Sequence, residues 1–178
     1  MKQINVVATE LIKESKAVVD TAKVLTEKYS CIPETLEHIE NVRNAIEKIR
    51  KELIIRGLEH DAAKMEEPEV SYFDKYTPLL KTMEYGSPEY TDSLEKLKPA
   101  LEHHYATYRH HPEHYKNGIQ DMNLVDIMEM FCDWYAASMR TKNGNMQNSI
   151  DISCKRFNIC PDLKQIFINS VELLTKKY

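Results

Sequence analysis

Glycine is scarce in this chain, and no other feature limits the choice of fold as strongly. Four glycines occur among 178 residues, while 29% of the residues are charged. Turn-rich β architectures use more glycine, because glycine adopts left-handed turn conformations at no steric cost. Apolar residues also recur with a helical period, as at Leu11, Val18 and Leu25. We therefore expect an all-α protein that folds as a compact helical bundle.

Prolines and glycines divide the chain into expected helices. The first expected helices cover residues 5–29 and about 33–53, the latter with Pro33 in its first turn, and a short helical stretch with His60 and Asp61 follows an interruption at Gly57. After a loop or short helix up to Pro78, further helices are expected over residues 89–109, capped by Ser87, and over residues 122–140. Two last helices flank Pro161. No repeat or linker separates them. A chain of this length is expected to form one domain, residues 1–178.

Charge and cysteine usage argue against several classes of protein. The net charge is −4 and the basic residues are spread out, so stable binding to nucleic acid is not expected. The four cysteines form no CxxC pair, and the N-terminus has no apolar signal segment, which is typical of reduced thiols in a cytoplasm. No uncharged apolar run approaches membrane-spanning length, so no membrane partner is expected.

Histidine is concentrated in one short stretch. Five of the seven histidines are His103, His104, His110, His111 and His114. Imidazole binds transition-metal ions. The pairs 103–104 and 110–111 are seven residues apart, or about 10.5 Å on a straight helix. They can share an ion if the helix ends around residue 110, where the following proline disfavours helix, and His111 folds back. Two separate ions are the alternative.

Two further histidines and three acids complete the candidate site. His60 and Asp61 are adjacent, and on a helix they project about 100° apart, so both can bind one ion or the carboxylate can bridge two. His38 lies at the edge of an apolar helix face. Asp133 lies in the most apolar helix, where a carboxylate is costly unless paired or bound to metal. Glu129, one turn earlier, either orients a ligand histidine or is a surface acid.

The order of these residues resembles the H…HD…D signature of the HD-domain superfamily of metal-dependent phosphohydrolases. His60-Asp-Ala-Ala-Lys64 is similar to the HDxxK form of the HD-GYP phosphodiesterases, without their GYP tripeptide. The resemblance implies an HD-type helical bundle that holds one or two divalent ions, such as Mn, Mg, Co, Fe or Zn. The metal ligands that it implies are His38, His60, Asp61 and Asp133. From the histidine-rich stretch we expect His104 and His111 to bind a second ion or to contact the substrate.

The chain resembles still more closely DUF5662, a family of uncharacterised phage and bacterial proteins. The resemblance spans about residues 35–174 and leaves the N-terminal helix, residues 1–30, outside. The residues that carry it are His38-Ile39, His60-Asp61, Lys64, Pro68-Glu69, His103-His104-Tyr105, Arg109-His-His-Pro-Glu-His-Tyr115, Gly118-Ile119 and Glu129-Met-Phe-Cys-Asp-Trp134. Tyr108 departs from the pattern, where Asn is expected. The resemblance implies the cytoplasm of a bacterium or of a phage-infected host.

The HD resemblance implies a metal-dependent phosphohydrolase that acts on a nucleotide or a related small phosphate ester. In that role Lys64, Asp61 and Glu129 would take part in catalysis, and Arg109, His103 and His110 would bind the substrate. Two alternatives stay open, an HD-type di-iron oxygenase and a non-catalytic module that binds a nucleotide or a partner. The small phosphate compound is the expected partner, and a homodimer also stays open.

Overall fold

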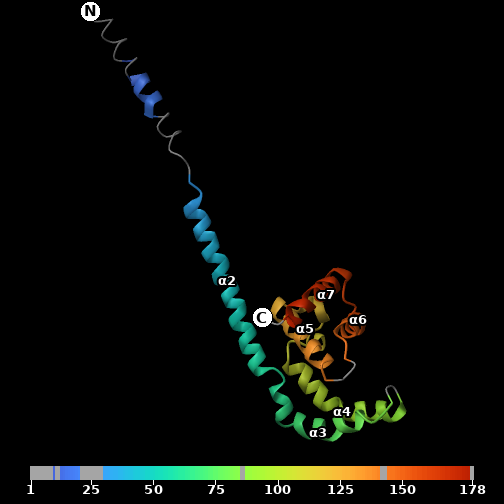
Figure 1. Ribbon diagram of the computed structural model, residues 1–178. Helices are drawn as coiled ribbons and strands as arrows, with labels where there is room; N and C mark the ends of the chain where they lie inside the picture. Colours follow the sequence, from blue (N-terminus) through green and yellow to red (C-terminus); the bar gives the residue numbers. More distant parts are fainter. Residues whose placement is uncertain (1–9, 11–12, 21–29, 85–86, 141–143, 177–178) are drawn as a thin grey trace, which may run out of the picture. The chain divides into compact units, whose positions relative to one another are not determined.

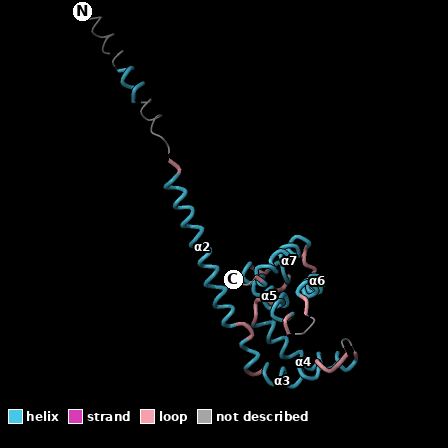
Figure 2. The backbone as a smooth tube through the Cα atoms, viewed as in Figure 1, coloured by secondary structure: helices cyan, strands magenta, loops and turns pink. Residues whose placement is uncertain are grey.

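The computed structural model describes residues 10, 13–20, 30–84, 87–140 and 144–176. Every regular element within these ranges is helical, which confirms the all-α prediction (Figures 1 and 2). The elements are α2 (Ile32–Glu59), η1 (Ala62–Met65), α3 (Glu69–Leu80), α4 (Pro88–Thr107), η2 (Pro112–His114), η3 (Gly118–Asp121), α5 (Leu124–Ser138), α6 (Met146–Arg156) and α7 (Pro161–Thr175). Of the predicted helix 5–29, residues 10 and 13–20 are helical and the others lie outside the described residues. None of the described helices is both long and apolar enough to cross a bilayer.

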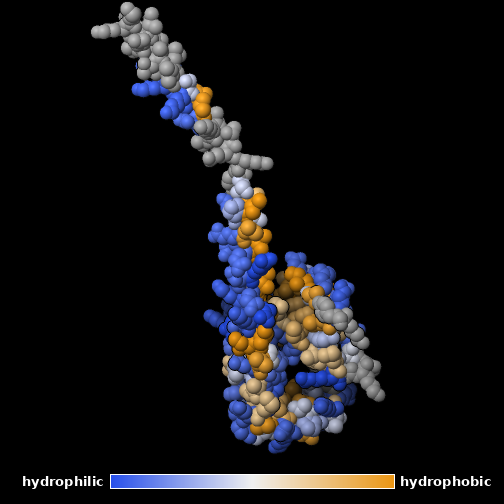
Figure 3. Space-filling view, turned by 60° about the vertical axis from the view of Figure 1, so that its left-hand side comes forward, coloured by the Kyte–Doolittle hydropathy of each residue, from blue (hydrophilic) through white to orange (hydrophobic). Residues whose placement is uncertain are grey.

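The chain divides into two compact units, residues 1–47 and 48–178. Within the first unit, α2 begins at Ile32 with Pro33 in its first turn, as predicted. Apolar side chains form an exposed stripe along α2, which includes Ile39, Val42 and Ile46 (Figure 3). The predicted interruption at Gly57 is wrong, because α2 continues to Glu59. A single glycine costs a helix only about 1 kcal/mol relative to alanine, and good helix formers precede it.

In the second unit, α5, α6 and α7 surround the main apolar core. Met130, Phe131, Ile150 and Phe167 are buried there, and the rings of Phe131 and Phe167 stack with centroids 5.4 Å apart. Asn123 begins α5 with a capping box, in which its side chain accepts from the backbone of Asp126. The cap fixes the start of α5 and the core packs against it, and α5 carries several residues of the candidate site.

The remaining helices of the second unit place the histidines. Helices α3 and α4 pack against each other. The predicted loop or short helix before Pro78 is a helix of 12 residues that contains this proline. Ser87 caps α4 as predicted, since its hydroxyl accepts from the backbone of Tyr90 at 3.1 Å. Helix α4 ends at Thr107, short of the predicted residue 109, and Tyr108 follows in an extended conformation. This early end lets the chain reverse before His110.

Candidate metal-binding site

The His60–Asp61 pair lies in a turn between α2 and η1. The prediction that both residues are helical is wrong, because α2 ends at Glu59 and Asp61 adopts φ 57° and ψ 14°. Aspartate tolerates this left-handed conformation better than most residues, because its short polar side chain makes local hydrogen bonds. Here Asp61 Oδ2 accepts from Lys64 Nζ at 2.6 Å. The turn leaves the other carboxylate oxygen, Oδ1, facing His104 and His110.

The end of α4 brings three histidines together. His104 lies in the last turn of α4, and His110 and His111 follow the reversal at Tyr108. The imidazole centroids of His104 and His111 are 4.7 Å apart, and those of His110 and His111 are 4.1 Å apart. The sequence left open whether the histidine pairs could meet. They do meet, because the helix ends before the second pair.

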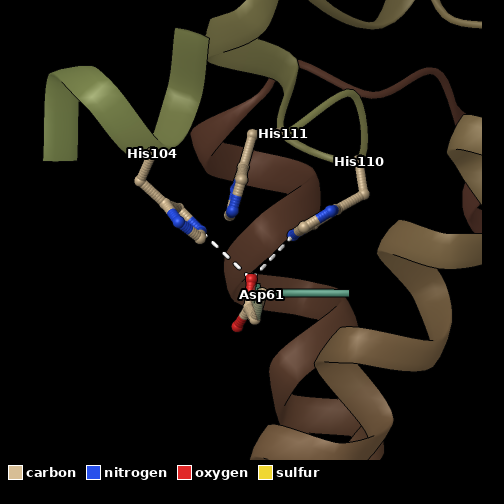
Figure 4. Close-up of side chains that lie close together, drawn as sticks. All are labelled: Asp61, His104, His110 and His111. Atoms are coloured by element: carbon tan, nitrogen blue, oxygen red, sulfur yellow. Dashed lines mark ion pairs between the residues drawn. The ribbon is translucent and has the colours of Figure 1, made fainter. Parts of the chain in front are cut away.

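Asp61, His104, His110 and His111 form what we call the triple-histidine cluster (Figure 4). One ligand atom from each residue lies within 4.8 Å of the ligand atoms of the others. Asp61 Oδ1 is 3.2 Å from His104 Nε2 and 3.7 Å from His110 Nε2. Donors that share an ion, each about 2.1 Å from it, lie at most about 4.2 Å apart. The cluster therefore needs only a slight contraction to surround one ion.

The ligand atoms of this cluster are buried without hydrogen-bond partners among the described residues. They are Asp61 Oδ1 and the Nε2 atoms of His104, His110 and His111. Buried polar atoms nearly always have a partner, and leaving one without a partner costs about 1–3 kcal/mol. Four such atoms that converge on one point fit a divalent cation. These residues are therefore a buried group that can hold a metal ion.

Two buried carboxylates hold the imidazole rings from the opposite side. Glu69 accepts from His104 Nδ1 at 2.9 Å and from His103 Nδ1 at 2.8 Å. Glu129 Oε1 lies 2.9 Å from His60 Nδ1 and 3.0 Å from His110 Nδ1. A proton held on Nδ1 leaves the Nε2 lone pair free for a metal, which is the usual arrangement around ligand histidines. Glu69 begins α3 within the Pro68-Glu69 pair of the family pattern, and that pair was the one sequence signal for it.

A second group of donors lies on the other side of Asp61. His60 Nε2 is 3.7 Å from Asp61 Oδ2 and 3.7 Å from Asp133 Oδ1. The two oxygens of Asp61 thus face different histidines, Oδ1 toward His104 and Oδ2 toward His60. This arrangement permits the Asp61 carboxylate to bridge two ions. Lys64 Nζ occupies the same side as His60 and neutralises part of the charge.

The surroundings of His111 and Asp61 keep these two ligands in the forms that bind a cation. Burial, together with the neighbouring His110 and His104, lowers the pKa of His111 to about 3, so its ring is neutral near pH 7. Burial opposes ionisation of Asp61, yet the neighbouring His104 ring and the hydrogen bond from Lys64 hold its pKa well below the usual range. The nearby carboxylates of Asp133 and Glu129 raise the pKa of His60 to about 10. In the absence of metal, a proton on His60 therefore balances the acids around it.

Asp126 anchors a network of cations beside the site, and sequence reasoning missed it. The guanidinium of Arg109 donates to both Asp126 oxygens, at 3.1 and 3.0 Å, and the Tyr115 hydroxyl donates at 2.7 Å. Arg56 pairs with the same carboxylate, and its Nε lies 3.0 Å from Glu129 Oε2. The fully buried Asp126 is also the third residue of α5, so its capping role was the available signal. The predicted contact of Arg109 with substrate stays a prediction, because its guanidinium is engaged here.

Several other predicted residues lie outside the triple-histidine cluster. His38 is exposed on α2 within the first unit, and its role as a ligand stays a prediction. His103 is partly exposed and contacts Glu69. His114 Nδ1 lies 2.9 Å from the carbonyl oxygen of Tyr105. Tyr108, which departs from the family pattern, accepts from the backbone amide of Ala63 at 2.5 Å and so ties the α4 end to η1.

Helices that place imidazole and carboxylate donors around one buried point define an all-α protein with a candidate metal site. The chain belongs to a family of unknown function, DUF5662, whose model matches residues 27–173. The family resemblance seen in the sequence is thereby confirmed. No curated protein and no solved structure matches the chain. The chemistry of the site is therefore argued from its own residues.

Proposed function

We propose that this protein is a metal-dependent phosphohydrolase that acts on a small phosphate ester. The observation that carries the proposal is the convergence of four buried donor atoms without hydrogen-bond partners among the described residues, from Asp61, His104, His110 and His111. A divalent ion held there would lower the pKa of a bound water toward 7 and neutralise charge on the phosphoryl oxygens. The resemblance to the HD-domain superfamily, with its H…HD…D order, supports the same reaction class.

The chain's own residues would supply position and charge for this hydrolysis. Asp61 and the three imidazoles would hold the ion; Glu69 orients the His104 ring through its Nδ1 atom, and Glu129 Oε1 lies 3.0 Å from the Nδ1 atom of His110. Lys64 Nζ, 2.6 Å from Asp61 Oδ2, would contact the phosphate oxygens. The water oxygen bonds to phosphorus as the ester P–O bond breaks. The alcohol leaves with a proton, and inorganic phosphate is the other product.

The proposal is tested on purified protein by elemental analysis and by a hydrolysis screen of phosphate esters with Mn, Co, Mg, Fe and Zn. We expect bound divalent metal and release of phosphate, both lost in a His104→Ala, His111→Ala double variant. His114→Ala is the matched control, because His114 contacts the Tyr105 carbonyl outside the cluster. Wild-type protein that binds no divalent metal, or a double variant with wild-type activity, would refute the proposal.

A di-iron oxygenase is the second candidate, and the bridging position of Asp61 favours it. One carboxylate faces histidines on both sides, with His104 Nε2 at 3.2 Å and His60 Nε2 at 3.7 Å. Histidine and carboxylate ligands suit iron as well as zinc or manganese. Aerobically purified protein with two iron ions per chain, visible absorption and oxygen consumption, and without phosphatase activity, would establish this candidate over the hydrolase.

A further inference from the structure

A mostly apolar cavity lies beside the second donor group. It has a volume of about 410 Å³ and lies between the last turns of α2 and helix α5. Its apolar lining comes from Leu53, Gly57, Met128, Cys132 and Ala136. Pockets for small organic molecules have volumes of about 300–1,000 Å³ and are lined mainly by apolar groups with a few polar ones. The size and lining therefore fit a small organic ligand.

The charged residues that line the cavity are largely engaged with one another. Arg56 pairs with Asp126 and with Glu129, and Glu129 also contacts His60. Among the described residues, Arg56 is the one lysine or arginine of this lining. Its charge is already balanced by two carboxylates, so a ligand with several phosphates would bring negative charge to a wall that offers no spare cation. The polar end of the cavity is the pair His60 and Asp133, 3.7 Å apart.

We infer that this cavity binds the organic part of the substrate, and that the substrate is the phosphate monoester of an apolar alcohol. The inference rests on the proposed hydrolase function. The single phosphate would extend past His60 toward Lys64 and the ion held at Asp61, and the aryl or alkyl body would lie against Met128 and Ala136. Hydrolysis would release that apolar alcohol and inorganic phosphate. A nucleoside triphosphate fits this lining less well, because it carries several charges on a polar body.

Gly57 gives a direct way to fill the cavity. A Cβ added at Gly57 meets no atom within 4 Å, and the residue lies inside α2, so larger side chains enter open space and favour the helix. Gly57→Leu should fill part of the cavity, whereas Gly57→Ala adds a single methyl group with a similar gain in helix propensity. Ala136→Leu fills it from α5, and Ala137→Leu is its control, because Ala137 is exposed and does not line the cavity.

The experiment compares 1-naphthyl phosphate with glycerol phosphate and ATP on metal-loaded wild-type and variant proteins. We expect kcat/KM for 1-naphthyl phosphate to exceed that for the other two compounds by about tenfold or more, because the cavity removes an aromatic body from water. Gly57→Leu and Ala136→Leu should each lower kcat/KM for 1-naphthyl phosphate, relative to kcat/KM for glycerol phosphate, roughly tenfold. Gly57→Ala should lower it less, and Ala137→Leu should leave it as in the wild type.

A direct binding measurement separates the two proposals. The naphthyl fluorescence of 1-naphthyl phosphate is titrated with protein, and inorganic phosphate is the competitor. Binding that Gly57→Leu weakens, without hydrolysis of any ester, would support the cavity as a ligand site and refute the hydrolase. Equal hydrolysis of all three compounds, unchanged in Gly57→Leu and in Ala136→Leu, would support the hydrolase and overturn the inference about the substrate.

Discussion

Glu69→Gln tests whether a buried carboxylate outside the cluster prepares the site for metal. Glu69 is fully buried, and its two oxygens accept from His103 Nδ1 at 2.8 Å and His104 Nδ1 at 2.9 Å. Glutamine has nearly the same shape, but one of its two terminal groups is an NH₂ donor. One imidazole N–H therefore loses its acceptor. If His104 moves its proton to Nε2 in response, the atom that should bind the ion is blocked.

The expected loss follows from that one hydrogen bond. A hydrogen bond to a charged group contributes about 1.5–3 kcal/mol, and each 1.4 kcal/mol is about tenfold in affinity. Glu69→Gln should therefore weaken metal binding roughly 10- to 100-fold, in line with the loss of other carboxylates that orient ligand histidines. The assay is competition between the protein and a chromogenic chelator for zinc or manganese at constant pH. The circular dichroism of each variant confirms that it is folded.

Glu66→Gln is the matched control, because Glu66 lies three residues earlier on the same segment and is exposed. It should bind metal as the wild type does. The reasoning is refuted if Glu69→Gln folds and binds metal with wild-type affinity. A loss of the same size in Glu66→Gln would show that net charge, and not the orientation of His104, controls the affinity.

The remaining predictions concern metal, pH and packing. Saturating metal, at about 100 times its Kd, should stabilise the folded protein by about 2.7 kcal/mol and raise its Tm, and a chelator should reverse that rise. A Tm that stays the same when metal is added would contradict the site. Burial opposes ionisation of Asp126, but hydrogen bonds from Arg109 and Tyr115 hold its pKa below the usual value. The ionised Asp126 therefore adds to the free energy of unfolding above about pH 4, and this contribution is lost as the pH falls below that value. In urea titrations, the free energy of unfolding of Asp126→Asn should decrease less on acidification than that of the wild type. Ile150→Ala should cost about 2–5 kcal/mol of unfolding free energy, because Ile150 is fully buried between α5, α6 and α7, whereas the exposed Ile152→Ala should cost far less in the same titration.

The helices were predictable because their signals are local. Asn and Ser caps, prolines in first turns and apolar residues at helical spacing depend on neighbours a few positions away. Ser87 and Pro33 therefore act as predicted. The continuation of α2 through Gly57 could not be predicted from the glycine alone. Glycine costs a helix about 1 kcal/mol, and whether the helix ends there depends on how strongly the flanking residues favour helix.

The site was predictable in its residue types and less so in its geometry. His104 and His111 were expected as ligands, and the structure brings both to Asp61 together with His110, which was expected to bind substrate. Which of the adjacent histidines faces inward depends on where α4 ends and on the extended backbone of Tyr108. The hydrogen bond between Glu69 and His104 depends on the packing of α3 against α4. No local sequence pattern reveals this contact between distant segments.

The backbone at Asp61 restricts which residues can replace it. At φ 57° glycine and asparagine fit with little strain, whereas other side chains in a left-handed conformation cost about 1–2 kcal/mol. Aspartate is the one residue that both tolerates this conformation and supplies two charged oxygens. Asp61→Glu, conservative in charge, is therefore expected to disturb the turn more than Asp61→Asn does. Under the proposed function, asparagine or glycine at this position would keep the turn and remove the charged ligand, so Asp61→Asn should fold as the wild type does and bind metal more weakly.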